Sequence, residues 1–527
     1  MFDLSIYEAL KIYIVEANGV QLFLFHKIRY VIIMEYNSRT NNNNTYQWRL
    51  CMNFKKLMIL ATLVFCISSF FGCGLIEDEK EPLDPSKPIT ITVWHYYNGQ
   101  IKDRFDAMVG EFNETVGIER GVVVDAQSLG DVKQLANSVF DAANHKIGSQ
   151  PLPDLFMAYP DNAFRVNNIS ELVDLETLFT EVELERYRNE FLEEGRIGSD
   201  QKLLILPIAK STENIYVNKT FWDEFSNDTG ADVGKLSTWE GTVEIAELYY
   251  KHTGKAFLGI DSKANYMLLS AMQLGNEMYT FDEDGVHLNF TSNTAKNIWE
   301  YYYVPYIKGY FEKNGRFSSD DAKIGNVLAY TGSTAGASYF PTEVTTEKNE
   351  VYSIEPMTLP YPYFATGKPY AFQQGAGMCV SKSDEAHEFG AGLFLKWFTE
   401  PEQNIEFAVS AGYFPVMNES LSWEKLIEQV EVLEIAGPAI PHMMESTIYM
   451  FDNYTLYNNE PFEGSFELRD LLENHLSNKI SKDLELLNDK VAGGEHRSEV
   501  IEFLISDSEF DRWYNEIVND LSLILGE

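Results

Sequence analysis

Cysteine is scarce in this chain of 527 residues, which contains only four. Three of them, Cys51, Cys66 and Cys73, lie near the N-terminus, so the rest of the chain holds Cys379 alone. A single thiol permits neither an internal disulfide nor a thiolate metal site in that part of the chain. A chain of this length can bury a core large enough to fold without disulfides, and it has room for two or three domains.

Basic residues are also few: 41 lysines and arginines stand against 80 aspartates and glutamates, for a formal charge of −39. A field of this sign repels nucleic acids and anionic lipid surfaces, so neither is an expected partner. The chain lacks a Walker loop, a G-x-G-x-x-G motif and an H-E-x-x-H motif, and its nine histidines have no metal-ligand spacing. We therefore expect no cofactor and no metal site.

Long apolar runs are limited to one, from Leu57 to Phe71. It is shorter than the run of about 20 residues that a comfortable transmembrane helix needs. The run follows Lys55-Lys56 and ends before Gly72, and this order of basic, apolar and small residues is typical of a secretory signal.

The end of this run, Phe70-Phe71-Gly72-Cys73, resembles the lipobox of bacterial lipoproteins, although that family usually has Leu where this chain has Phe70. The resemblance implies a signal peptide over residues 52–72 and a lipid on Cys73, the first residue of the mature protein. The alternative is a plain signal peptide that happens to contain Cys73.

A signal that begins at Met52 cannot act at the N-terminus if translation starts at Met1. We expect residues 1–51 to be a non-native extension, and a genuine extension is the alternative. Residues 73–87 are acidic and contain proline, which indicates a tether. The protein is thus expected to be exported and lipid-anchored to the outer face of the cell membrane.

Apolar periodicity beyond the tether predicts strands and helices in turn. Alternation over 89–94 predicts a strand, apolar residues at helical spacing over 105–112 predict a helix, and 122–124 predicts a short buried strand. A helix over 132–143 and a strand over 155–159 follow. This order predicts parallel strands with right-handed crossovers, which is an α/β architecture.

Further elements are predicted by shorter signals. Residues 202–208 (KLLILPI) read as another strand, and Thr238 as the N-cap of a helix. Ser381-x-x-Asp384 is a capping-box pattern, and Pro401 opens the next helix. Apolar spacing predicts helices in the C-terminal segment.

Several of these stretches, taken in order, resemble the large extracellular solute-binding proteins of ABC importers, the class that includes maltodextrin-binding protein. The resemblance covers most of residues 88–420. It is carried by Ile91–Trp94, Leu152–Leu155, Leu206-Pro207, Tyr216–Lys219, Ser237–Glu240, Phe394–Thr399 and Ala411–Val416.

The resemblance implies two α/β lobes joined by a hinge, with the solute bound in the cleft between them. One lobe would consist of 88–210 and 373–430, the other of 211–372, and 431–527 would form helices that pack on the lobes. The chain would cross the hinge near 209–213 and near 372–377.

The candidate ligand residues lie at strand ends and at the two crossings. A sugar has apolar faces and a belt of hydroxyl groups, so its site needs aromatic rings together with amides, hydroxyls or carboxylates. Gly332-Ser333-Thr334 exposes backbone and is not a nucleophile elbow, because its glycine directly precedes the serine. For the aromatic residues the alternative is core packing, and for 210–213 it is a solvated hinge. The candidates are Trp94, His95, Tyr96, Tyr97, Tyr159, Lys210, Ser211, Thr212, Glu213, Gly332, Ser333, Thr334, Gln373, Gln374, Gly375, Gly412 and Tyr413.

The resulting hypothesis is a monomeric binding lipoprotein, not an enzyme, that captures an oligosaccharide and delivers it to an ABC permease. The first alternative is the same fold binding a polyol phosphate or phosphodiester, with positive charge from Lys210 and His95. The second is a cell-surface glycoside hydrolase with two carboxylates in its cleft. The third is a receptor that only senses the solute and feeds a kinase.

Overall fold

The computed structural model describes residues 82–282, 285–345, 349–433 and 437–526. The predicted extension, the signal peptide, Cys73 and most of the tether lie outside these residues. Within the described part of the chain, no helix combines the length and the apolar character that crossing a membrane requires.

The first lobe is built on a four-stranded sheet with the order β15-β3-β1-β2. Its strands are β1 (Ile89–His95), β2 (Val122–Ser128), β3 (Leu155–Ala158) and β15 (Gly377–Val380). β1 is parallel to β2 and β3, which confirms the predicted pairing, and β15 runs antiparallel to β3.

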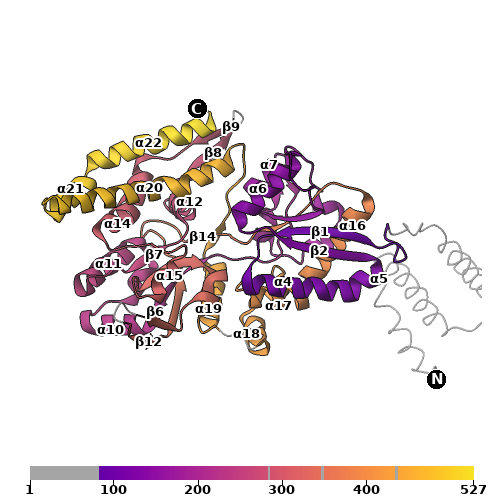
Figure 1. Cartoon of the computed structure of the whole chain (residues 1–527), viewed down its shortest axis with the longest axis horizontal. Coiled ribbons are helices and arrows are strands. Elements are labelled where there is room, and N and C mark those ends of the chain that lie inside the picture. The colour runs from indigo at the N-terminus through magenta and orange to yellow at the C-terminus, as the bar shows by residue number, and fades with distance from the viewer. Residues whose placement is uncertain (1–81, 283–284, 346–348, 434–436, 527) are drawn as a thin grey trace, which may run out of the picture. The chain divides into compact units, whose positions relative to one another are not determined.

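Helices cover this sheet on two sides. In Figure 1, α6 (Val132–Ala143) and α7 (Pro160–Asn167) lie above β1 and β2, and α4 (Gly99–Phe112) and α17 (Pro401–Ser410) lie below them. α16 (Glu385–Thr399) packs against β1, where Gly390 lets the helix approach Ile89 and Ile91. The core between these elements is rich in phenylalanine, including Phe105, Phe398 and Phe407.

The second lobe has its own four-stranded sheet, with the order β13-β6-β10-β7. β6 (Glu213–Asn218) is antiparallel to both β10 (Ala329–Ser333) and β13 (Pro356–Pro360), and β7 (Leu258–Ile260) is parallel to β10. Ile215, Val217 and Ala329 of this sheet belong to a second hydrophobic core, whereas Tyr216 and Tyr330 belong to the same core as the first lobe. The helices of the second lobe include α10 (Lys219–Thr229), α11 (Trp239–Thr253), α12 (Lys263–Gln273), α13 (Ser292–Ile298), α14 (Val304–Lys308), α15 (Ser318–Lys323) and the 3-10 helix η5 (Thr334–Tyr339).

The C-terminal segment is helical, as predicted. It contains α18 (Trp423–Val432), α19 (Ala439–Asn453), α20 (Ser465–Ala492), α21 (Arg497–Leu504) and α22 (Asp507–Leu525). α20, α21 and α22 lie side by side in Figure 1, and the apolar faces of α20 and α22 belong to the second core. One short strand, β16 (Thr455–Tyr457), pairs with β14 (Tyr370–Phe372).

Two helix starts agree with their sequence signals and a third does not. Thr238 caps α11 by accepting a hydrogen bond from the Gly241 amide, and α17 begins at Pro401. The predicted cap at Ser381 is wrong, because α16 begins at Glu385 and Asp384 accepts from the amides of Ala386 and His387. The Ser381 hydroxyl donates to the Pro153 carbonyl instead.

The predicted strand over 202–208 is also wrong in extent. Only β5 (Lys202–Leu203) pairs, with β4 (Arg196–Ile197), and Leu206 forms an isolated bridge to Met378. Pro207 has no amide hydrogen to continue a ladder. The segment continues as buried chain, with a bend at residues 208–209, toward the first crossing.

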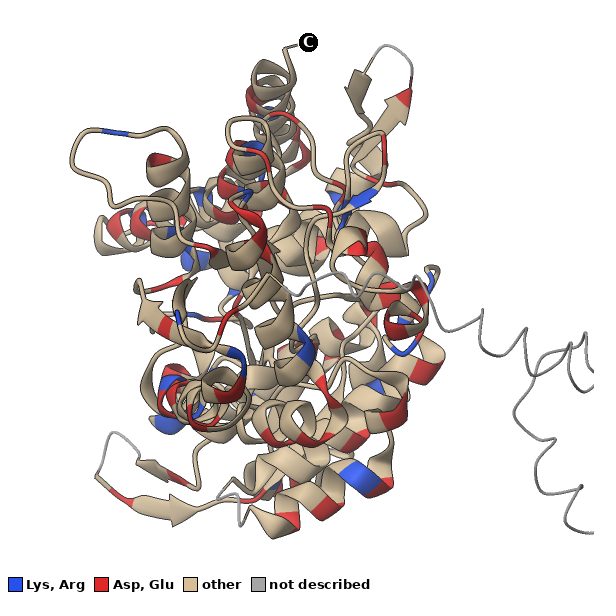
Figure 2. Cartoon of the chain, turned by 90° about the vertical axis from the view of Figure 1, so that its right-hand side faces the viewer, with Lys and Arg blue, Asp and Glu red and all other residues tan. Residues whose placement is uncertain are grey.

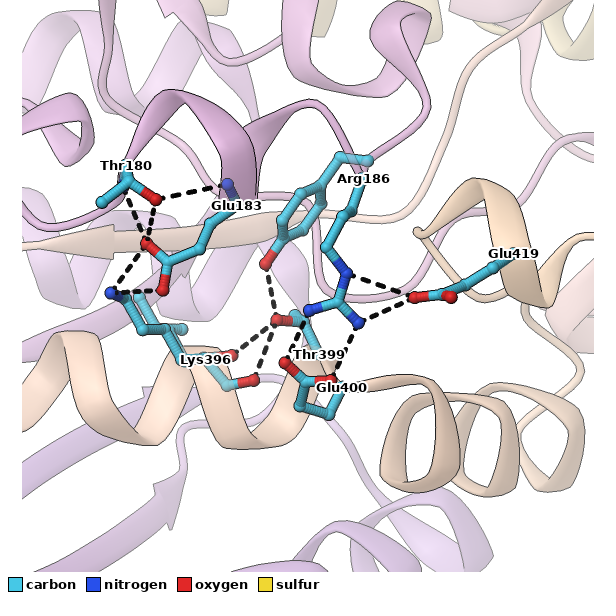
Figure 3. Close-up of polar contacts among 9 residues, drawn as sticks. Thr180, Glu183, Arg186, Lys396, Thr399, Glu400 and Glu419 are labelled. Carbon is cyan, nitrogen blue, oxygen red and sulfur yellow. Dashed lines mark hydrogen bonds and ion pairs between the residues drawn. The ribbon is translucent and has the colours of Figure 1, made fainter. Parts of the chain in front are cut away.

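Ion pairs fix the junction of α16 and α17, which precedes the Gly412-Tyr413 loop (Figure 3). Arg186 donates two parallel hydrogen bonds to Glu400, of 2.8 and 2.9 Å, and a third to Glu419, of 2.7 Å. Lys396 pairs with Glu183, whose carboxylate also accepts from Thr180. A forked guanidinium–carboxylate contact restricts geometry more than a single ion pair does.

Candidate functional site

The two segments predicted to cross between the lobes lie side by side. Ser211 and Gln374 exchange backbone hydrogen bonds of 2.9 and 2.8 Å, and Lys210 and Phe414 exchange a second pair of 3.0 and 2.7 Å. The first segment leads from the first core into β6, and the second leads from β14 to β15. Three stretches far apart in the sequence therefore meet at one place.

Gly375 allows these segments to approach each other closely. Its φ is +91°, and a Cβ atom there would lie 2.4 Å from the Ala209 carbonyl oxygen. Only glycine adopts this positive φ without strain and also leaves space for the Ala209 carbonyl.

Lys210 is engaged inside the protein. Its side chain is 1% exposed, and its Nζ donates to the Glu194 carboxylate and, at 2.9 Å, to the Gly375 carbonyl. Burial lowers the pKa of Lys210, and the charge of Glu194 opposes this. Its positive charge is consequently matched by a protein carboxylate rather than presented to a solute.

Tyrosines from three segments gather beside the crossings. Tyr96 interacts through its hydroxyl with Tyr413 and with Tyr159, and the Tyr159 hydroxyl accepts from the Gly375 amide at 3.3 Å. Tyr96 and Tyr159 are half-buried as whole residues, and burial raises the pKa of both hydroxyls. Tyr339, at the end of η5 in the second lobe, is 48% exposed and also lies near Tyr413.

Trp94, His95 and Tyr97 are buried in the first core instead. Nδ1 of His95 accepts from the Tyr97 amide at 3.2 Å, and burial lowers the pKa of His95 to about 4. The imidazole is therefore neutral near pH 7 and supplies no positive charge to the site.

Glu213 is the buried carboxylate at the first crossing. Its Oε1 accepts from Gln374 at 3.0 Å and from Asn265 at 3.2 Å. Asn265 in turn accepts a hydrogen bond from Arg469, at the start of α20. Burial raises the pKa of Glu213 to about 7, and the two amide donors oppose this.

This raised pKa predicts a pH dependence of stability. The folded-state pKa of Glu213 lies above its unfolded value, so the protonated group stabilises the folded protein. This contribution to the free energy of unfolding is complete below about pH 4.5 and is lost as the pH rises through about 7. Between pH 5 and pH 8 the free energy of unfolding should fall by about 2–3 kcal/mol more in the wild type than in Glu213→Gln, whose amide oxygen still accepts both hydrogen bonds. Urea denaturation at the two pH values measures this difference, and equal pH dependence in both proteins would contradict it.

The segment Gly332-Ser333-Thr334 lies next to the first crossing. Ser333 pairs with Glu213 between β10 and β6, and the Thr334 amide donates to the Thr212 carbonyl at 2.9 Å. Gly412 of the first lobe, with φ +71°, meets Thr334 so closely that a Cβ atom would lie 2.9 Å from its carbonyl oxygen. The loop before Tyr413 therefore contacts the second lobe.

Besides Nε2 of His95 in the first core, three candidate side chains carry buried polar atoms without a hydrogen-bond partner among the described residues: the hydroxyls of Thr212 and Thr334 and the amide nitrogen of Gln373. Such atoms cost free energy unless water or a solute satisfies them. The three side chains lie at or beside the two crossings, where a bound hydroxyl group would be useful.

Four residues of this region were not predicted from the sequence: Glu194, Asp161, Asn265 and Arg469. Asp161 follows the end of β3 by three residues, so the strand-end rule that selected Tyr159 applies to it as well. The other three carry no local signal, because the fold alone brings them to the crossings.

Among the described residues, no group of three or more histidines, cysteines and carboxylates is placed to hold a metal ion. A cavity of about 260 Å³, lined by residues of 230–251 that include Lys235 and Glu244, lies on the second lobe and contains none of the candidates.

The chain is similar to known proteins both in sequence and in fold. The sequence profile of the family described as bacterial extracellular solute-binding protein matches residues 107–432. No curated protein sequence matches the chain.

Solved structures share the fold at low identity, and such likeness shows the fold alone. The cyclic α-maltosyl-1,6-maltose binding protein from Arthrobacter globiformis has 18% identity and a TM-score of 0.57 over 82% of this chain and 100% of its own. UgpB from Mycobacterium tuberculosis, in complex with glycerophosphocholine, has 16% identity and a TM-score of 0.59 over 83% and 98%. An ABC substrate-binding protein from Listeria monocytogenes, in complex with cycloalternan, has 14% identity and a TM-score of 0.57 over 82% and 99%.

Proposed function

Since the chain belongs to the bacterial extracellular solute-binding proteins, we propose that it captures an oligosaccharide outside the cell and presents it to an ABC permease. The observation that carries the proposal is the meeting of both crossings with half-buried tyrosines and with an amide–carboxylate cluster. Rings can stack on the apolar faces of a sugar, and amides and carboxylates can pair with its hydroxyl groups.

The charges favour a sugar over a phosphodiester, the ligand class of UgpB in its complex with glycerophosphocholine. Lys210 is paired with Glu194, and His95 is buried with a lowered pKa. The face shown in Figure 2 carries acidic residues on many elements, in keeping with the formal charge of −39. A phosphate group would meet a negative electrostatic field, and Lys210 and His95 would not supply the positive charge that the phosphodiester alternative requires.

Isothermal titration calorimetry tests the proposal. The full chain is titrated with maltotriose, mannotriose, cycloalternan and glycerophosphocholine. At least one neutral sugar should bind with micromolar or better affinity, which is about −8 kcal/mol or stronger. Binding of glycerophosphocholine alone would favour the phosphodiester alternative.

The proposal also excludes catalysis. Prolonged incubation should leave a bound oligosaccharide at its original mass, because a carrier releases its solute unchanged. Shorter products would support the glycoside hydrolase alternative. Loss of sugar uptake on deletion of the gene would support delivery to a permease, and continued uptake would support a receptor that only senses.

We further propose that Cys73 anchors the protein to the membrane. The lipobox-like sequence and the preceding apolar run support this. Detergent phase separation should recover the wild type in the detergent phase and Cys73→Ser in the aqueous phase. Equal partition of both proteins would favour the plain signal peptide.

A further inference from the structure

Helix α20 begins beyond the residues that the family profile matches, yet its first turns touch both lobes. Leu468, Leu472 and Leu476 bury one face of the helix in the second core. On the other side, the guanidinium of Arg165 in α7 lies 3.7 Å from the centre of the Phe466 ring. α20 is therefore placed to connect the second lobe to the first.

The Arg165 guanidinium that contacts Phe466 is held in place by other residues of the first lobe. Arg165 donates to the Asn162 side chain at 2.8 Å and to the Ala136 carbonyl at 3.1 Å, and its guanidinium also lies 4.4 Å from the centre of the Phe140 ring. The interaction of a guanidinium with two rings is a well-defined contact, and in a partly buried setting it is stabilising. This contact sets the position of the first turn of α20.

Arg469 lies in the same turn as Phe466, and no carboxylate of the described residues forms an ion pair with it. Its side chain donates a hydrogen bond to Asn265, and its guanidinium lies 5.2 Å from the centre of the Phe372 ring at the second crossing. Arg186, Arg196 and Arg512 by contrast each pair with glutamates. Arg469 is half-buried and forms no ion pair with another described residue, so its guanidinium retains N–H donors for another partner.

Asp161 supplies a matching acceptor from the first lobe. Its Oδ1 accepts from the Asn162 amide, and no described cation lies within ion-pair distance of its carboxylate. Burial raises the pKa of Asp161, and the charge of Arg469 opposes this, so the two groups share one environment. No hydrogen bond or ion pair between described residues joins Asp161 to Arg469, so the donor on one lobe and the acceptor on the other are not bound to each other.

We propose that Arg469 contacts the solute and that Arg469 and Asp161 hold it from the two lobes. Arg469 donates to oxygen atoms of the solute, and Asp161 accepts from its hydroxyl groups. The carboxyl group of Asp161 lies opposite the one guanidinium and can accept from hydroxyl groups but not from a phosphodiester, so the pair selects a neutral polyhydroxylated solute and disfavours a phosphodiester. This inference rests on the proposed function and names the groups that set its specificity.

The test compares calorimetric affinities of the full-length wild type, Arg469→Gln and Arg497→Gln. Arg497 is a matched control, because it is an exposed arginine at the start of α21. The sugars among maltotriose, mannotriose and cycloalternan that bind the wild type should bind Arg469→Gln roughly 10- to 100-fold more weakly, the usual effect of losing a hydrogen bond to a charged group. Arg497→Gln should bind them as the wild type does.

Asp161→Asn provides a second, nearly isosteric variant, and sugar affinity should fall about tenfold. It keeps the proposal testable if Arg469→Gln does not fold. Equal sugar affinity in the wild type and in the folded variants overturns this inference alone, and so does glycerophosphocholine binding that is tightest in the wild type and depends on Arg469. If none of the three sugars nor glycerophosphocholine binds the wild type, the proposed function and this inference fall together.

Discussion

Replacing Lys210 by methionine is expected to lower the free energy of unfolding by about 3–5 kcal/mol. The ammonium group is buried with the Glu194 carboxylate, whose side chain is 9% exposed. Removing one partner leaves the other charge inside the protein without compensation. The Gly375 carbonyl loses a donor as well. Chemical denaturation followed by circular dichroism measures the change.

Lys219→Met is the matched control, because Lys219 forms an ion pair with Asp223 in which the side chains are 41% and 51% exposed. Exposed pairs contribute about 0–1 kcal/mol, so this variant should remain close to the wild type. Lys210→Met combined with Glu194→Gln should regain part of the loss, since the uncompensated charge is gone. A loss of less than about 1 kcal/mol in Lys210→Met would show that the buried pair does not hold the crossing together.

Gly375→Ala should have the next largest effect, a loss of about 2–4 kcal/mol together with weaker sugar binding. The positive φ strains an L-residue, and the new methyl group would collide with the Ala209 carbonyl on the neighbouring crossing. The two crossings must then separate. Denaturation and calorimetry on the same preparation report the two effects.

Gly336→Ala serves as the control for this prediction. Gly336 lies in η5, has no positive φ, and a Cβ atom there meets nothing within 4 Å. Its stability should change by no more than about 0.5 kcal/mol. Equal behaviour of the two alanine variants would mean that the close approach at Gly375 is not required.

The order of strands and helices was predictable because periodicity and turn residues are local signals. β1, α4 and β3 each carry a clear pattern, and parallel pairing follows from their order. The prediction of a strand over 202–208 failed for two reasons. Apolar residues indicate that a segment is buried but not that it pairs with another strand, and Pro207 has no amide hydrogen to continue a ladder. The prediction of a cap at Ser381 failed because the motif alone cannot tell whether Ser381 or Asp384, three residues later, caps the helix.

The candidate site was predictable only in part. β1 is covered by helices on both sides, so the alternation of its side chains could not show which of Trp94, His95, Tyr96 and Tyr97 faces an opening. Only Tyr96 among them is half-buried. Arg469 lies far along the chain from the crossings, and nothing in its neighbourhood distinguishes it from other arginines on helices.

The antiparallel position of β15 beside β3 also bears on biosynthesis. One strand of the first sheet is made only after the whole second sheet has been translated, so the edge of β3 waits unpaired in the meantime. Unpaired strand edges promote misassembly. A chain that is exported unfolded and folds outside the cell avoids this interval, because all strands of both sheets are then available before folding begins.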